Sequence, residues 1–210
     1  MRIALINENS QAGRNSVVFE ELNGVAKTKG YEVVNYGMFS AEDEDQLTYV
    51  QIGIIASILL TTKAADFVVT GCGTGQGAML ACNSFPNVLC GHIENPLDAF
   101  LFSQVNAGNC ISMPFAQNYG WGGELNLRYT FEKLFAEELG AGYPKDRVEP
   151  QQRNKKILDD VKKVTHNNLL DILKGLDRDL LLGAVKSKGF QDNFFEHCQD
   201  QEIADYIKSL

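Results

Sequence analysis

Residues 67–77 read FVVTGCGTGQG, an apolar, β-branched run that leads into a segment with four glycines. The run predicts a buried strand, and the residues from about Ala78 onward predict a helix. Glycines let the backbone approach a ligand closely, and the start of a helix adds partial positive charge. The segment Gly71–Gly77 therefore predicts an anion-binding loop that also holds a thiol, Cys72, and a hydroxyl, Thr74.

Strands and helices alternate on both sides of this loop. Further strands are predicted at residues 2–6, 31–36, 88–93 and 109–113, and helices at residues 15–29, 47–63, 96–105 and 125–139. This alternation indicates parallel strands with helices on both faces of the sheet. We predict an α/β fold with a doubly wound, Rossmann-like sheet of five parallel strands. Ligands bind at the carboxyl ends of such strands, where the loops at residues 7–13, 71–77 and 92–95 are expected to converge.

The strand pattern ends near Pro150. Residues 151–210 have apolar residues at helical spacing and no clear strand signal. We therefore predict an α/β domain of residues 1–150 and a helical C-terminal extension of residues 151–210. The extension is expected to pack on the domain, to lengthen a dimer interface or to cap the site.

The charge distribution excludes several classes of partner. The net charge is −8, and residues 1–150 carry 9 Lys and Arg against 17 Asp and Glu. No basic patch indicates nucleic-acid binding. The longest apolar run, Ile52–Leu60, is too short to cross a membrane. We expect a soluble, cytoplasmic protein with neither nucleic-acid nor membrane partners.

The chain has five cysteines with no closely spaced pair of the metal or redox type. Four of them are expected to be small buried residues in a reducing compartment: Cys82, Cys90, Cys110 and Cys198. Cys72 differs because it lies in the glycine loop. The sequence predicts no metal site.

A dinucleotide-binding site is one alternative for the loop. Residues 73–78 fit the pattern G-x-G-x-x-A, and Glu94 lies about where an acid would bind the ribose. That fingerprint normally follows the first strand, whereas here it follows the third. A dinucleotide-dependent oxidoreductase therefore remains the lesser hypothesis.

A family resemblance supports a different function. Residues 69–83, VTGCGTGQGAMLACN, resemble the Cys-Gly-Thr-Gly-x-Gly segment of type B ribose-5-phosphate isomerases and galactose-6-phosphate isomerases. Residues 103–109 resemble that family's helix end before the fifth strand. Residues 143–147 and 151–153 resemble its phosphate-binding arginine region, so the resemblance covers about residues 1–153.

The resemblance implies an aldose–ketose isomerase, an intramolecular oxidoreductase that acts on a sugar phosphate without a cofactor or metal. Cys72 matches the cysteine that moves a proton between adjacent carbons, through an enediolate. A nearby helix N-terminus favours a thiolate. The amides of Gly73, Thr74 and Gly75 are suited to hold the enediolate oxygen, as in an oxyanion hole, and Gly77 belongs to the same loop. The Thr74 hydroxyl is expected to bind substrate or orient the base, or else to stabilise the loop.

Two departures from the family concern the substrate. Glu8 and Asn9 stand near the family's Asp-His pair, and Val105, beside Asn106, stands where the family has a ring-opening histidine. Three explanations are open. The substrate is an open-chain or short sugar phosphate rather than ribose 5-phosphate; or His92 opens the ring; or the protein binds phospho-sugars without turnover.

We expect polar side chains to bind the hydroxyl groups of the substrate and arginines to bind its phosphate. Glu8, Asn9 and Asn106 are candidate ligands of sugar hydroxyls, and the candidate phosphate ligands are Arg14, Arg147 and Arg153. In the family the arginines reach the site across a subunit interface. The resemblance therefore implies a homodimer, or a tetramer, with a shared active site.

Overall fold

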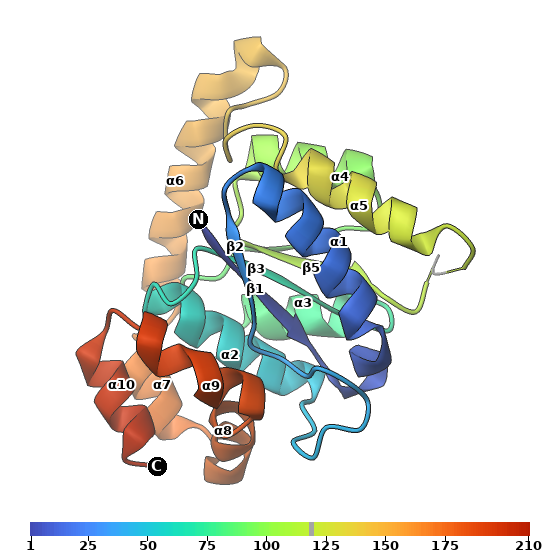
Figure 1. The fold of residues 1–210 in the computed structure, drawn as a ribbon. Coiled ribbons are helices and arrows are strands. Elements are labelled where there is room, and N and C mark those ends of the chain that lie inside the picture. Colours follow the sequence, from blue (N-terminus) through green and yellow to red (C-terminus); the bar gives the residue numbers. More distant parts are fainter. Residues whose placement is uncertain (118–119) are drawn as a thin grey trace.

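The central feature of the fold is one parallel sheet. The computed structural model describes residues 1–117 and 120–210 (Figure 1), and in them five parallel strands pair in the order β2-β1-β3-β5-β4. Their bounds are β1 Arg2–Asn7, β2 Glu32–Asn35, β3 Phe67–Cys72, β4 Cys90–His92 and β5 Cys110–Pro114. Strand β3 lies at the centre, between β1 and β5. The predicted doubly wound fold is confirmed.

Helices cover both faces of the sheet (Figure 1). One face packs against α1 (Asn15–Thr28) and α5 (Gly123–Leu134), and α4 (Pro96–Leu101) packs beside α5. The other face packs against α2 (Tyr49–Thr61) and α3 (Gln76–Asn83). The core between the sheet and α1, α4 and α5 is called the first core, and the core on the α2 and α3 face is called the second core. In β1, Ile3 and Leu5 belong to the first core, whereas Ala4 and Ile6 belong to the second. This alternation follows from the two-residue period of a strand.

The C-terminal helices complete the second core. Their bounds are α6 Val148–Thr165, α7 Leu169–Gly175, α8 Arg178–Val185, α9 Lys188–His197 and α10 Gln201–Lys208. Figure 1 shows α7 to α10 grouped on the side of α2 that faces away from the sheet. Every residue from Ile52 to Leu60 is therefore buried, which explains why α2 is apolar around its whole circumference. The predicted boundary at residue 150 falls in the first turn of α6.

Helix α6 differs from the other long helices because it has no buried residue. It stands at one side of the molecule and reaches beyond the sheet (Figure 1). We call its exposed apolar side chains the α6 stripe: Ile157, Leu158, Val161 and Val164. Their three- and four-residue spacing places them on one side of the helix. A surface of this kind marks an interaction site more often than a solvated face.

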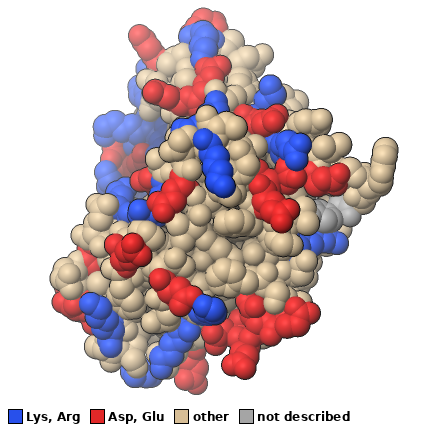
Figure 2. Space-filling model, in the orientation of Figure 1, with Lys and Arg blue, Asp and Glu red and all other residues tan. Residues whose placement is uncertain are grey.

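The surface view agrees with the acidic composition. Figure 2 shows acidic side chains gathered at the lower right, and basic side chains elsewhere interspersed with acidic ones. The segment between β2 and α2 contributes four consecutive acids, Glu42–Asp45. None of the helices in the described residues has the length and apolar character that a membrane crossing requires.

Candidate active site

Cys72 is the last residue of the central strand. Gly71 pairs with Asn7 of β1 and Met113 of β5, and Cys72 pairs with Pro114. The predicted loop is therefore shorter than expected, because Gly71 and Cys72 belong to the strand and α3 already begins at Gln76. Only 9% of Cys72 is exposed. The thiol thus lies at the carboxyl edge of the sheet, where ligands bind in this architecture.

Two glycines allow the backbone to pack closely around the thiol. A Cβ atom on Gly71 would lie 2.3 Å from the Met113 carbonyl oxygen and 2.5 Å from the Phe115 ring. Gly75 has φ +74°, and a Cβ atom there would lie 2.8 Å from the His92 ring. Both positions therefore require glycine for steric reasons, and Gly75 also for its backbone conformation.

The loop offers unused hydrogen-bond donors. Within residues 1–117 and 120–210, no acceptor pairs with the N–H groups of Gly73, Thr74 or Gly75. Two backbone carbonyls of this segment do have partners. The Phe115 N–H donates to the Cys72 oxygen and the Ala116 N–H donates to the Gly73 oxygen, each at 3.0 Å. A Cβ atom on Gly73 would meet nothing closer than 3.8 Å. The backbone is thus fixed while space for a ligand remains beside it.

Thr74 and His92 hold the loop in place. The exposed Thr74 Oγ1 accepts a hydrogen bond from the Gln76 amide at 3.3 Å, so this hydroxyl stabilises the turn into α3. The His92 Nε2 lies 2.9 Å from the Thr74 carbonyl oxygen and must carry a proton to donate to it. Its Nδ1 lies 3.6 Å from Glu94 Oε1. His92 therefore contacts the glycine loop, but its Nε2 is already engaged.

The loop after β1 lies beside the same edge. Glu8 is buried and its carboxylate accepts hydrogen bonds from the Ser10 amide at 2.9 Å and the Ser10 Oγ at 2.6 Å. The backbone N–H of the exposed Asn9 donates to the Leu47 carbonyl oxygen. Asn7 is fully buried, and its Oδ1 has no hydrogen-bond partner among the described residues. Because Asn7 pairs with Gly71, this unpartnered acceptor lies beside the strand end that carries Cys72.

Arg14 connects to the glycine loop through Gln11. The Arg14 Nη1 donates to Gln11 Oε1 at 3.0 Å. The Gln11 Nε2 is one of the two atoms nearest to the space beside Gly73. A cation expected to bind an anionic substrate therefore lies close to the candidate base in the same chain.

The other expected ligands lie at the opposite edge of the sheet. Asn106 ends a short π-helix, η2 (Phe102–Asn106), before the amino end of β5. Arg147 ends η3 (Lys145–Arg147), Arg153 lies on α6, and both are exposed. Helix α6 packs on η2. Within one chain, this group is therefore separated from Cys72 by the length of the strands.

Three residues near the loop were not anticipated. They are Gln11, whose amide faces Gly73; Tyr49, whose half-exposed ring lies against Gly77; and Ser112, whose Oγ donates to the Gly75 oxygen at 2.6 Å. Gln11 falls in the loop predicted to converge on the site. No sequence pattern around Tyr49 or Ser112 indicates a place at the site, because only the packing of α2 and β5 brings these residues to the loop.

The arrangement suits proton transfer beside a developing negative charge. A thiol, free amides and a helix N-terminus meet at one edge, as an enediolate intermediate requires. The glycine segment follows the third strand, unlike a dinucleotide fingerprint, which follows the first. Among the described residues, the group able to bind a metal is Cys82, Cys90 and Cys110, which lies away from Cys72.

Comparisons with known proteins agree with this geometry. A family model described as ribose/galactose isomerase matches residues 3–157, and one described as ribose-5-phosphate isomerase matches residues 164–210. A solved 4-deoxy-L-threo-5-hexosulose-uronate ketol-isomerase, complexed with a tartrate, is 58% identical with a TM-score of 0.97; the match covers 100% of this chain and 98% of that chain.

Two ribose-5-phosphate isomerases are also similar. The enzyme from Vibrio parahaemolyticus is 53% identical with a TM-score of 0.96, over 100% of this chain and 98% of that chain. The type B enzyme from Trypanosoma cruzi is 16% identical with a TM-score of 0.65, over 79% of this chain and 100% of that chain. At that identity the likeness shows the fold alone.

Proposed function

Because this chain belongs to the ribose/galactose isomerase family, we propose that it interconverts an open-chain aldose and its ketose, with Cys72 as the base. The observation that carries this proposal is the position of Cys72. The thiol ends the central strand beside three N–H groups that have no acceptor within the described residues. The reaction is an aldose–ketose isomerisation, and we place it in the cytoplasm.

In the proposed mechanism, the Cys72 thiolate removes the proton from the hydroxyl-bearing carbon next to the aldehyde. The electron pair moves into an enediolate, and the negative charge develops on the former carbonyl oxygen. The free amides of Gly73, Thr74 and Gly75 offset that charge. The hydroxyl proton on the second carbon then passes to the former carbonyl oxygen, and Cys72 gives a proton to the former aldehyde carbon, which yields the ketose and restores the thiolate. Because the thiolate is restored in each cycle, no cofactor has to be consumed, and a thiol proton that exchanges with solvent before its return labels the substrate in heavy water.

We infer an open-chain substrate from the residues that surround the base. Val105 stands where the resemblance places a ring-opening histidine, and Asn9 cannot act as an acid. The Nε2 of His92 is engaged by the Thr74 carbonyl. The 58% identical relative is named for a hexosulose uronate, whose anionic group is a carboxylate. We therefore propose a substrate with an anionic end, either a carboxylate or a phosphate.

A second copy of the chain completes the site in this proposal. Arg14 lies near Cys72 in the same chain, whereas Asn106, Arg147 and Arg153 lie at the far edge. A homodimer that places the far edge of one copy against the loop of the other brings both groups together. The α6 stripe, which is exposed on the same side as Arg153, supplies an apolar surface for such an interface.

Exchange of substrate hydrogen in heavy water tests the proposed reaction. The panel contains a 4-deoxy-5-hexosulose uronate, a four-carbon aldose phosphate, ribose 5-phosphate and galactose 6-phosphate. We expect deuterium at the carbon next to the carbonyl, fastest for a compound that cannot close a stable ring. The uronate and the four-carbon phosphate distinguish a carboxylate-binding site from a phosphate-binding one.

Each other outcome of the panel contradicts a defined part of the proposal. Faster exchange with ribose 5-phosphate than with either open-chain compound would contradict the substrate class. Binding of a sugar phosphate without exchange would favour a phospho-sugar-binding protein. Protection from heat by a nicotinamide dinucleotide alone would favour the oxidoreductase hypothesis.

Charge placed on the α6 stripe is expected to separate the copies. The double variant Ile157→Glu/Val161→Glu should reduce the mass in solution from a multiple of 23.2 kDa to that of one chain. Burying two carboxylates in an apolar interface is costly. Turnover should fall about 10–100-fold, the range for losing charge-assisted hydrogen bonds to the substrate. Light scattering and initial rates provide the two measurements.

Lys163→Glu is the matched control. It changes the net charge by the same −2, and its side chain points to the opposite side of α6. This control should keep the wild-type mass and rate. A wild-type protein that is monomeric at micromolar concentration would contradict the shared site.

A further inference from the structure

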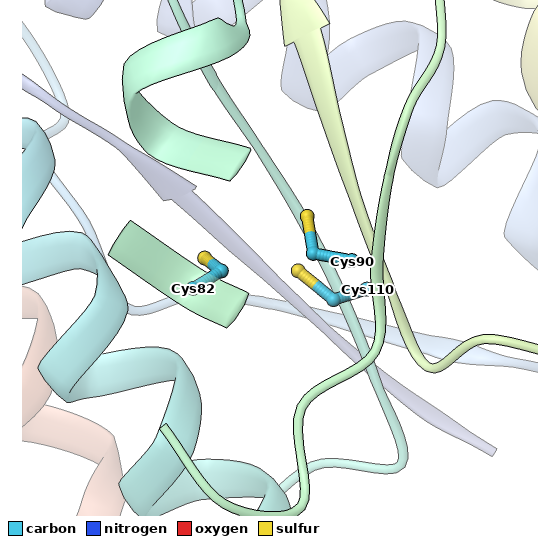
Figure 3. Close-up of side chains that lie close together, drawn as sticks. All are labelled: Cys82, Cys90 and Cys110. Atoms are coloured by element: carbon cyan, nitrogen blue, oxygen red, sulfur yellow. The ribbon is translucent and has the colours of Figure 1, made fainter. Parts of the chain in front are cut away.

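Three cysteines that lie far apart in the sequence meet inside the second core. Cys82 comes from α3, Cys90 from β4 and Cys110 from β5, and Figure 3 shows the three side chains lying close together. All three sulfurs lie within 4.8 Å of one another. Cys90 and Cys110 are register partners on neighbouring strands, so their side chains leave the sheet on the same face. Helix α3 lies over that face and contributes the third sulfur.

The three thiols make few contacts with other polar groups. The Cys90 and Cys110 thiols donate only long hydrogen bonds, to the Gly91 oxygen at 3.8 Å and the Ile111 oxygen at 3.9 Å. A basic side chain lies beside the cluster, because the Lys162 Nζ donates hydrogen bonds to the Asn83 and Val88 oxygens. Lys162 thus places a nitrogen cation beside the segments that carry Cys82 and Cys90.

The cluster is accessible from one side. Cys82 and Cys110 are fully buried, whereas Cys90 is 8% exposed. Cys90 lines a cavity of about 390 Å³ between α6 and the sheet, together with Phe102, Leu158 and Lys162. In a single copy of the chain, a small ion can therefore reach Cys90 without unfolding the core.

We propose that Cys82, Cys90 and Cys110 form a three-coordinate binding site for Cu(I). A metal–sulfur distance of about 2.3 Å places three sulfurs of a trigonal site about 4 Å apart, so the observed cluster needs only a small contraction. Thiolates are soft ligands that select Cu(I) and Zn(II). Zinc is almost always four-coordinate in structural sites, and the described residues add no fourth His, Cys, Asp or Glu to this group. The donor set therefore favours Cu(I).

Binding involves no change in the oxidation state of copper. The ion displaces the protons that remain on the three thiols, and these protons leave to solvent. The resulting complex carries a net charge of −2, from three thiolates and one Cu(I) ion. Lys162 offsets part of that charge. Affinity should fall as the pH is lowered, because protons and copper compete for the same sulfurs.

An occupied site would stabilise the elements that carry the active site. Helix α3 begins at the glycine loop, β4 ends at His92, and β5 supplies Ser112, which holds the Gly75 oxygen. A metal that joins α3, β4 and β5 binds the folded chain more tightly than the unfolded one, so it should raise the melting temperature.

The test is an anaerobic titration of the full chain with Cu(I) in competition with the chromophoric chelator bicinchoninate. We expect one tightly held ion per chain and an ultraviolet thiolate-to-copper band, both in the wild type and in Cys72→Ser. Cys82→Ser should weaken binding by more than the roughly 10–100-fold that outer-shell changes cause. Lys162→Met should weaken it by about tenfold, the effect of one unit charge near a partly solvated site.

Cys198→Ser is the matched control, because Cys198 lies outside the cluster and donates to the Asp200 oxygen. It should bind copper like the wild type. If Cys82→Ser does not fold, as judged by circular dichroism, Cys90→Ser replaces it, since that sulfur is the most exposed of the three. Equal copper binding by the cluster variants and the wild type would overturn the proposal. Tight binding of Zn(II) in place of Cu(I) would overturn the assignment to copper.

Discussion

Cys72→Ser is expected to lower kcat by about three to four orders of magnitude, at the upper end of what one general base contributes. A serine hydroxyl fits the same place at the end of β3, but it ionises far less readily than a thiol and cannot remove a proton from carbon. KM should change little, because the free amides and the cations proposed to bind the substrate are unaffected. Initial rates and deuterium exchange in heavy water measure the two effects separately.

Cys198→Ser is again the control, since it removes a thiol outside the site. Its rate should equal that of the wild type. The cysteine-base hypothesis fails if Cys72→Ser retains substantial exchange into the substrate. A second variant, Thr74→Val, should instead act through the turn into α3, where its hydroxyl accepts from Gln76.

Removal of residues 166–210 is expected to prevent folding. Without α7 to α10, the outer side of α2 from Ile52 to Leu60 would be exposed to water. The deleted segment contributes these fully or nearly fully buried side chains to the second core: Leu169, Leu173, Leu181, Val185, Phe190, Phe194, Ile203 and Ile207. Burying each such side chain stabilises a fold by about 1.5–3 kcal/mol, and a whole domain is stable by only about 5–15 kcal/mol.

Solubility on expression and cooperative unfolding in urea are the measurements for this truncation. We expect aggregated protein, or a chain with no cooperative transition. Phe194→Ala in the full chain is the milder companion, with an expected loss of about 3–5 kcal/mol. A soluble 1–165 fragment that unfolds cooperatively would show that the extension is an independent appendage.

Much of the fold was predictable because its signals are local. The β-branched runs, the helical spacing of apolar residues and the glycine segment each depend on neighbours in the sequence. They placed all five strands and located Cys72 at a carboxyl edge. The exact limits were less accurate: Gly71 and Cys72 extend β3, because the register with β5 continues to Pro114.

The candidate site was predictable only where one segment supplies it. Gly73, Thr74 and Gly75 lie in the stretch that also holds Cys72, so the sequence placed them together. Tyr49 and Ser112 reach the loop only through the packing of α2 and β5. The sequence predicts a helix at residues 47–63, but the helices that cover its outer side lie more than 100 residues later in the chain.

The sequence by itself determined the alternation of strands and helices, the glycine loop and the thiol within it. These depend on backbone preferences and on spacings of a few residues. Tertiary structure alone decided that Cys82, Cys90 and Cys110 meet, and that Asn106, Arg147 and Arg153 lie at the edge opposite Cys72. The physical reason is that strand order and register set distances between distant residues, and no local pattern records them.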